Sequence, residues 1–168
     1  MDITKIKYDG ARAELLWEIL QAKSDTVNKY SMESADQPTE AFKKALQALA
    51  PFVCDICEFE ENYKAGMTIR GITCTYSSEK RVMGVMIHVV KKLPESNRVF
   101  PFNTPFLPEA SPVEGGAELA RPCAIAIREL LREAEKYING ERAQIDMFPA
   151  GTRKAGTKQS MKMETADA

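Results

Sequence analysis

The stretch that decides the fold is residues 81–91, which read RVMGVMIHVVK. Apolar side chains occupy both alternating sets of positions in this stretch. One set is Met83, Val85, Ile87 and Val89, and the other is Val82, Met86 and Val90. Because successive strand residues point to opposite faces, two apolar faces predict a strand in the interior of a sheet or one covered on both sides.

Two more strands are predicted next to this one. Residues 67–76 are rich in Thr, Ile and Tyr, with Gly71 at a position typical of a bulge, and residues 77–80 form the predicted hairpin turn. Residues 98–106 contain proline and can form at most an edge strand. Residues 107–118 are rich in Pro, Gly and Glu and predict a loop.

The N-terminal part of the chain predicts three strands. Residues 2–8 are followed by the turn pair Asp9-Gly10, and residues 13–20 alternate apolar and acidic side chains. Residues 13–20 also have good helix propensity, so a helix is the competing prediction there. A weaker strand is predicted over residues 26–33.

Two amphipathic helices complete the predicted elements. Residues 36–40 carry cap residues, a proline and an acidic residue, which is typical of a helix start. Apolar residues then recur every three or four positions as far as Ile56, and Pro51 is expected to kink or split this helix. A second helix is predicted over residues 121–138, with Gly140 as its C-cap.

The order of these elements predicts an α+β domain at residues 1–140. We expect two β-β-β-α units that form a largely antiparallel sheet packed by two amphipathic helices. Residues 141–168 are predicted to be a flexible, disordered tail, because the sequence after residue 148 has almost no apolar content.

Composition and charge exclude several classes of protein. The chain has 168 residues, of which 44% are apolar and 28% charged, and no apolar stretch approaches the ~20 residues of a membrane span. The N-terminus lacks a signal pattern, so we expect a cytoplasmic protein with no membrane contact. The net charge is −1, with +2 on residues 149–168 and −3 on the rest, which argues against nucleic-acid binding by bulk electrostatics alone.

Cysteine and histidine form no pattern of a catalytic or metal site. Cys54 and Cys57 form a C-x-x-C at the end of a predicted helix, where the helix dipole does not favour a thiolate. Zinc would need two more ligands, yet the chain has a single histidine, His88, and no second C-x-x-C. We therefore expect structural thiols, a hydrogen-bonded structural histidine, no cofactor, no metal and no catalytic residue.

One short segment does indicate a function. Residues 144–148 read Gln144-Ile145-Asp146-Met147-Phe148. This segment resembles the peptide by which polymerases, repair proteins and regulators bind the bacterial sliding clamp, which runs Gln, any residue, Ser or Asp, Leu or Met, then Phe. Each constrained position matches, and a match somewhere in a chain of this length has a chance probability of about half a per cent.

The resemblance implies a role for each side chain of this segment. Met147 and Phe148 would enter an apolar pocket as anchors, Gln144 would fix the register through its amide, and Asp146 would shape the turn. The implied affinity is micromolar, about −8 kcal/mol, and a homo-oligomer would raise it by avidity. The competing interpretation is that Ile145, Met147 and Phe148 fold back onto the domain.

Five further segments carry a second resemblance. They read ALAPFVCDICE at 48–58, RGI at 70–72, VMG at 82–84, NTP at 103–105 and YINGERAQ at 137–144. These segments are similar to short proteins encoded in the early regions of tailed-phage and prophage genomes, a group with no established activity. The resemblance implies a setting, which is a bacterial host cell during phage or prophage gene expression.

We therefore expect a phage-type accessory protein of DNA replication or recombination, not an enzyme, that binds the sliding clamp of the bacterial host. The first alternative is a single-stranded DNA-binding protein with a basic ridge and two aromatic rings for base stacking, Tyr76 and Phe100. The residues of this ridge are Arg70, Lys80, Arg81, Lys91, Lys92 and Tyr76. The second alternative is an anti-defence protein that binds a host protein or sequesters a nucleotide signal.

Overall fold

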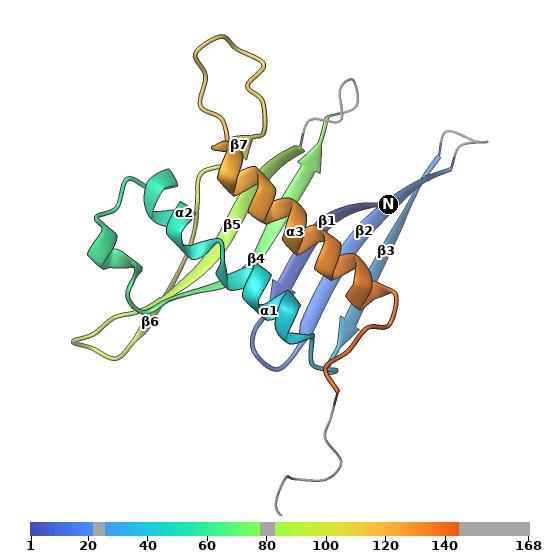
Figure 1. Ribbon diagram of the computed structural model, residues 1–168, viewed down its shortest axis with the longest axis horizontal. Helices are drawn as coiled ribbons and strands as arrows, with labels where there is room; N and C mark the ends of the chain where they lie inside the picture. The colour runs from blue at the N-terminus through green and yellow to red at the C-terminus, as the bar shows by residue number, and fades with distance from the viewer. Residues whose placement is uncertain (22–25, 78–82, 145–168) are drawn as a thin grey trace, which may run out of the picture.

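One antiparallel sheet forms the frame of the molecule (Figure 1). The structure is a computed structural model, and it describes residues 1–21, 26–77 and 83–144. The strands run in the order β3-β2-β1-β4-β5-β6, and β7 pairs with β5 off this path. Their bounds are β1 Asp2–Tyr8, β2 Ala13–Gln21, β3 Thr26–Ser34, β4 Met67–Tyr76, β5 Met83–Lys92, β6 Val99–Asn103 and β7 Leu107–Pro108.

The helices lie on one face of this sheet (Figure 1). They are α1 Glu40–Gln47, α2 Ala50–Ile56 and α3 Arg121–Ile138, and a short 3-10 helix, η1 Glu61–Lys64, follows α2. Thr39 caps α1, since its hydroxyl accepts a hydrogen bond from the Phe42 N–H. Pro51 lies in the first turn of α2, where its missing N–H is tolerated, so the first predicted helix is split into two.

The two halves of the chain have matching topologies. In each half the first strand lies at the centre of the sheet and the next two follow outward, as β1-β2-β3 and as β4-β5-β6. The halves meet where β1 and β4 pair antiparallel, through Lys5–Thr73, Ile6–Ile72 and Lys7–Gly71. This arrangement confirms the predicted α+β fold with two β-β-β-α units.

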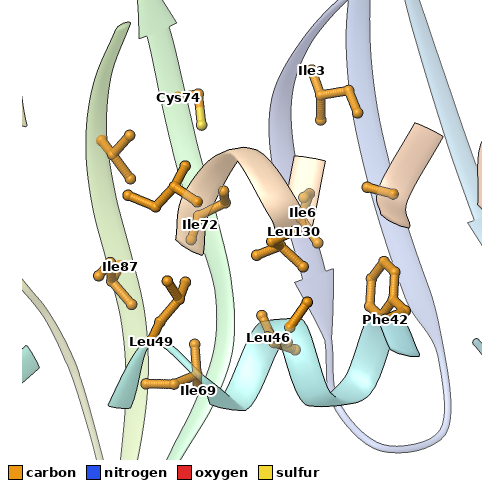
Figure 2. Close-up of a cluster of buried hydrophobic side chains, with 14 of the residues drawn as sticks. Ile3, Ile6, Phe42, Leu46, Leu49, Ile69, Ile72, Cys74, Ile87 and Leu130 are labelled. Atoms are coloured by element: carbon orange, nitrogen blue, oxygen red, sulfur yellow. The ribbon is translucent and has the colours of Figure 1, made fainter. Parts of the chain in front are cut away.

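The hydrophobic core lies between the sheet and the helices (Figure 2). Ile6, Ile72 and Ile87 come from neighbouring strands, and Leu46 of α1 and Leu130 of α3 cover them; all five are at most 1% exposed. Burying a side chain of this size contributes about 1.5–3 kcal/mol, so this layer holds the two halves together.

Most predicted strands are found where the sequence placed them. Residues 13–20 belong to a strand, β2, so the competing helix prediction is wrong. The bulge in β4 is confirmed, because the pairing with β5 shifts register between Ile69 and Gly71. The loop predicted over residues 107–118 contains one short strand that the sequence did not indicate, β7.

The second apolar face of β5 is not covered by a helix. Met86 and Val90 lie on the face of the sheet opposite the helices and are half-buried there. The position of β5 between β4 and β6 agrees with the prediction of an interior strand. Residues 78–82, which include the predicted turn except Ser77 and also include Val82, lie outside the described residues.

None of the helices in the described ranges combines the length and the apolar character needed to cross a bilayer.

Candidate functional site

The candidate site begins at the last described residue. Gln144 is exposed, whereas Ile145, Asp146, Met147 and Phe148 lie outside the described residues. What the structure shows is therefore how the chain reaches this segment.

Backbone hydrogen bonds hold the chain to the domain up to the residue before the segment. After α3 the Glu141 N–H donates to the Lys136 carbonyl at 3.0 Å, and Gly140 adopts a φ of +104° that an L side chain rarely adopts. The Ala143 N–H then donates to the Gln37 carbonyl at 2.9 Å. Gln144, the first residue of the candidate segment, follows directly.

Arg142 adds side-chain contacts at the same place. Its guanidinium lies 3.7 Å from the centre of the Tyr137 ring and donates a hydrogen bond to the Tyr137 carbonyl. Its Nε is 3.5 Å from Asp36 Oδ2, an ion pair without a hydrogen bond. The Tyr137 hydroxyl donates to the Asp36 carbonyl at 2.6 Å. These contacts join the end of α3 to the loop between β3 and α1 and fix the place where the candidate segment leaves the domain.

Lys91, one residue of the predicted basic ridge, is buried. Lys91 is 6% exposed, and its ammonium donates to the carbonyls of Tyr63 at 2.7 Å and Ala65 at 2.5 Å. The same ammonium lies 4.3 Å from the centre of the Tyr63 ring. Lys91 is thus a buried structural cation, and its assignment to a nucleic-acid surface is wrong.

The three other ridge residues that the structure describes, Arg70, Lys92 and Tyr76, have different surroundings. The Arg70 guanidinium donates to the Asp9 carbonyl at the β1–β2 turn, and Lys92 is exposed and follows Lys91 on the opposite face of β5. Tyr76 packs against the core, and its hydroxyl donates to the Ile3 carbonyl at 3.0 Å. Burial raises the pKa of Tyr76 well above its ordinary value. Lys80 and Arg81 lie outside the described residues.

Around Lys91 lies an aromatic cluster that the sequence reasoning missed. The ring of Phe59 lies 4.7 Å from that of Tyr63 and 5.8 Å from that of Phe102, which in turn lies 5.9 Å from Phe100. The four rings come from segments about 40 residues apart in the sequence, from Phe59 to Phe100, so no local spacing indicated the cluster.

The thiols have the chemistry of buried side chains. Burial raises the pKa of Cys74 to about 12 and that of Cys123 to about 11, and it also raises the pKa of Cys57. A reactive thiol needs the opposite shift, because the thiolate is the nucleophile and the metal ligand. Among the described residues, no group of three or more His, Cys, Asp or Glu side chains is placed to hold a metal ion.

His88 is hydrogen-bonded on both sides, as predicted. Its Nε2 lies 2.7 Å from the Thr73 hydroxyl and its Nδ1 lies 2.8 Å from Asn103 Oδ1. Because Asn103 Oδ1 can only accept, Nδ1 is assigned the proton and Nε2 accepts from Thr73. Both ring nitrogens are occupied across three neighbouring strands, which is the environment of a structural histidine.

An open hollow of about 860 Å³ lies on the sheet face opposite the helices. Its floor combines threonines with apolar side chains, among them Thr4, Leu16 and Thr73. Two of its charged groups are already paired, Lys5 with Glu14 at 2.8 Å and Glu18 with Lys29 at 3.2 Å. Within the described residues, the hollow is therefore an open surface on which Lys5 and Glu18 already have partners of opposite charge.

Comparison of the chain with protein-family models, with curated proteins and with solved structures finds no match.

Proposed function

We propose that this protein binds the sliding clamp of a bacterial host through residues 144–148. The observation that carries the proposal is the match of Gln144, Asp146, Met147 and Phe148 to each constrained position of the clamp-binding peptide. On this proposal the protein is a phage-type accessory factor of DNA replication or recombination that acts in the cytoplasm of the host cell.

The anchoring of the preceding residues supports the proposal. A linear peptide that starts at a fixed point on the surface has a defined place from which to reach a pocket on another protein. The last backbone contact of the chain before the segment is the one from Ala143 to Gln37, and Gln144 is exposed. The segment thus starts one residue beyond a fixed point at the surface, a position from which a large ring can be approached.

The described residues favour clamp binding over single-stranded DNA binding. The buried ammonium of Lys91 and the half-buried Tyr76, whose hydroxyl donates to the Ile3 carbonyl, are both used inside the domain. DNA binding would then depend on Arg70 and Lys92, on different strands, and on Lys80 and Arg81, which are not described. No contact of the described residues favours the anti-defence alternative.

The test is a calorimetric titration of the full chain with a purified bacterial sliding clamp. We expect micromolar binding by the wild type and a loss of at least about tenfold, or about 1.4 kcal/mol, for Phe148→Ala, because a buried aromatic anchor is removed. Gln144→Ala is expected to weaken binding in the same direction.

Ile145→Ala provides the matched control within the same segment. Residue 145 is the unconstrained position of the peptide, so this variant should bind within about threefold of the wild type. Equal binding by wild type and Phe148→Ala, or no binding by the wild type, would contradict the proposal. A lower melting temperature of Phe148→Ala would also count against it, since that result means that the ring packs on its own domain.

A further inference from the structure

We propose that β3 pairs antiparallel with β3 of a second copy of this chain, with the two-fold axis at Ser31, so that one sheet runs through both copies. This inference is independent of clamp binding. It rests on the geometry of the β3 edge and on the order of the side chains along it.

The two edge strands of the sheet, β6 and β3, differ in length and in proline content. The edge at β6 is five residues long and carries Pro101 in its middle, and proline cannot donate to a further strand. The edge at β3 is nine residues long, contains no proline, and pairs with β2 from Thr26 to Ser34 without a register shift. Within the described ranges β3 has a strand on one side only. A long and regular edge without proline is a template for another strand.

The side chains of β3 are more apolar than a solvent-facing edge requires. Val27 is 48% exposed and Tyr30 is 41% exposed, and Met32 is half-buried. Tyr30 is held in place, because its ring stacks on Trp17 of β2 with centroids 5.6 Å apart. β3 has no bulge that would turn its edge away, and its two charged residues, Lys29 and Glu33, have opposite signs, so they can pair across a two-fold axis instead of repelling a second copy.

Antiparallel self-pairing has few allowed registers. In an antiparallel pair, residues opposite each other lie on the same face of the sheet. Because faces alternate along a strand, the two-fold axis must pass between one residue and the same residue of the partner. An axis at Lys29 would place two lysines opposite each other, and an axis at Tyr30 would place Val27 opposite the partner's Glu33. An axis at Ser31 places Lys29 opposite the partner's Glu33 and Tyr30 opposite the partner's Met32. Only this last register of the three gives an ion pair on one face and an apolar contact on the other.

The existing ion pairs extend across this junction. Lys29 lies 3.2 Å from Glu18, and Glu33 lies 3.2 Å from Arg12. In the dimer the charges would alternate in sign from Glu18 to Lys29 to the partner's Glu33 to the partner's Arg12. Exposed ion pairs contribute little affinity, so we assign them the choice of register, while the backbone hydrogen bonds of the added strand supply the binding.

The first experiment measures the mass of the full chain by sedimentation equilibrium over a range of concentrations. We expect a dimer of twice the 18.7 kDa of the chain. Lys29→Glu and Glu33→Lys should each raise the dimer dissociation constant at least about tenfold, because each places like charges opposite each other. The double variant Lys29→Glu/Glu33→Lys restores opposite charges and should return to within about threefold of the wild type. Changes in the contacts with Glu18 and Arg12 are present in monomer and dimer alike and cancel in this comparison.

The second experiment tests the register by cross-linking. In the proposed dimer Ser31 faces Ser31 of the partner subunit, so Ser31→Cys should form an intermolecular disulfide under mild oxidation. The matched control is Asn28→Cys, which is equally exposed but about 20 Å from its own copy in this register. The wild type, with its own four cysteines, sets the background.

Three results would overturn the proposal. The first is a monomer at all concentrations, which would mean that the edge is not used or that another segment of the same chain covers it. The second is a dimer that is indifferent to both single charge reversals. The third is a dimer in which Asn28→Cys cross-links as readily as Ser31→Cys, since that dimer would use another register or another surface.

Discussion

The buried ammonium of Lys91 is surrounded by protein groups in place of water. It lies under η1, where two backbone carbonyls and one aromatic ring surround it. A charge in such a place is tolerated only when hydrogen bonds compensate for its desolvation. The contacts from Lys91 to Tyr63 and Ala65 therefore fasten η1 and the aromatic cluster to the sheet.

Lys91→Met tests this role of the ammonium. The variant keeps most of the side-chain volume and leaves the carbonyls of Tyr63 and Ala65 without their donor, so we expect the free energy of unfolding to fall by about 2 kcal/mol. The measurement is urea denaturation, and the matched control is Lys92→Met, the exposed neighbour, which should change stability by less than about 0.5 kcal/mol. Equal effects of the two variants would show that the buried contacts of Lys91 contribute nothing.

The position of Lys91 was predictable from its own strand. The inward-facing set Met83, Val85, Ile87 and Val89 continues with Lys91 at the same period of two. The charge at the end of the strand was interpreted as a solvent-facing residue, because the partners that satisfy it, Tyr63 and Ala65, are separated from it by more than 20 residues. Local sequence predicts which face of a strand a side chain lies on, but it does not predict which distant groups that side chain contacts.

At the scale of the element, the bulge in β4 is set by a glycine that touches backbone. A Cβ at residue 71 would lie 1.9 Å from the Ile6 carbonyl oxygen of β1. Beside this site the Gln47 side chain of α1 donates to the Ile69 carbonyl at 2.9 Å and accepts from the Ile69 N–H at 3.0 Å. The bulge is thus held from both sides, by β1 and by α1.

Alanine substitutions at Gly71 and Gly84 compare two kinds of steric clash, one with backbone atoms and one with a side chain. Gly71→Ala should destabilise the fold by about 3 kcal/mol, because β1 must move to accept the methyl group. A Cβ at Gly84 would also lie 1.9 Å from its nearest atom, but that atom is at the tip of the Phe106 ring, which is 47% exposed and free to rotate away. Gly84→Ala should therefore cost less than about 1 kcal/mol.

Thermal denaturation of the two variants under the same conditions makes the comparison. Similar losses for Gly71→Ala and Gly84→Ala would contradict the distinction between the two neighbours. The expected outcome is a clearly lower melting temperature for Gly71→Ala alone.

Elements with a long periodic pattern were predicted well, and a short element was missed. β4 begins and ends where the sequence indicated, at Met67 and Tyr76, because its residues are β-formers throughout and its ends are marked by turn residues. β7 spans two residues, Leu107–Pro108, which is too short for any period, and it exists because β5 offers it a partner. The splitting of the first helix at Pro51 followed from the chemistry of proline alone.

At the scale of the whole molecule, the buried thiols link stability to alkaline pH. The pKa of Cys74 is raised to about 12 and that of Cys123 to about 11, from an ordinary value of 9.0 that the unfolded chain retains. Below that ordinary value both states hold the proton and these groups do not affect stability. As the pH rises above it, the unfolded chain loses protons that the folded chain keeps, so the folded state becomes relatively less stable.

We therefore expect the free energy of unfolding to fall between pH of about 8 and about 10, by about 1 kcal/mol for each of the two thiols. Urea denaturation at several pH values measures this loss, and the double variant Cys74→Ala/Cys123→Ala should show a smaller loss over the same range. A stability that is flat up to a pH of about 10, or an identical loss in the double variant, would contradict this expectation.

The candidate clamp-binding site is the part of the molecule that the sequence indicated most directly. A linear peptide carries its recognition residues in five consecutive positions, so residues 144–148 needed no fold to be noticed. The fixed point before it could not be predicted, because Arg142 is held by Asp36 and Tyr137 through contacts that join distant parts of the chain. The burial of Lys91 could not be predicted for the same reason, since only the fold decides whether a lysine reaches the surface.

The narrow junction between the halves sets the order in which the chain can assemble. Apart from the two-residue β7, which pairs with β5, each of the other pairings joins strands that follow each other in the sequence. By contrast, β1 must find β4 across the whole first half of the chain, and the two share three opposed pairs. Hairpins close quickly because their loops are short, and distant pairings close late because they lose more chain entropy. We therefore expect the two three-stranded units, β1-β2-β3 and β4-β5-β6, to form early. The rate-limiting step of folding should be the docking of these units along β1 and β4, with α1 and α3 packing over that junction.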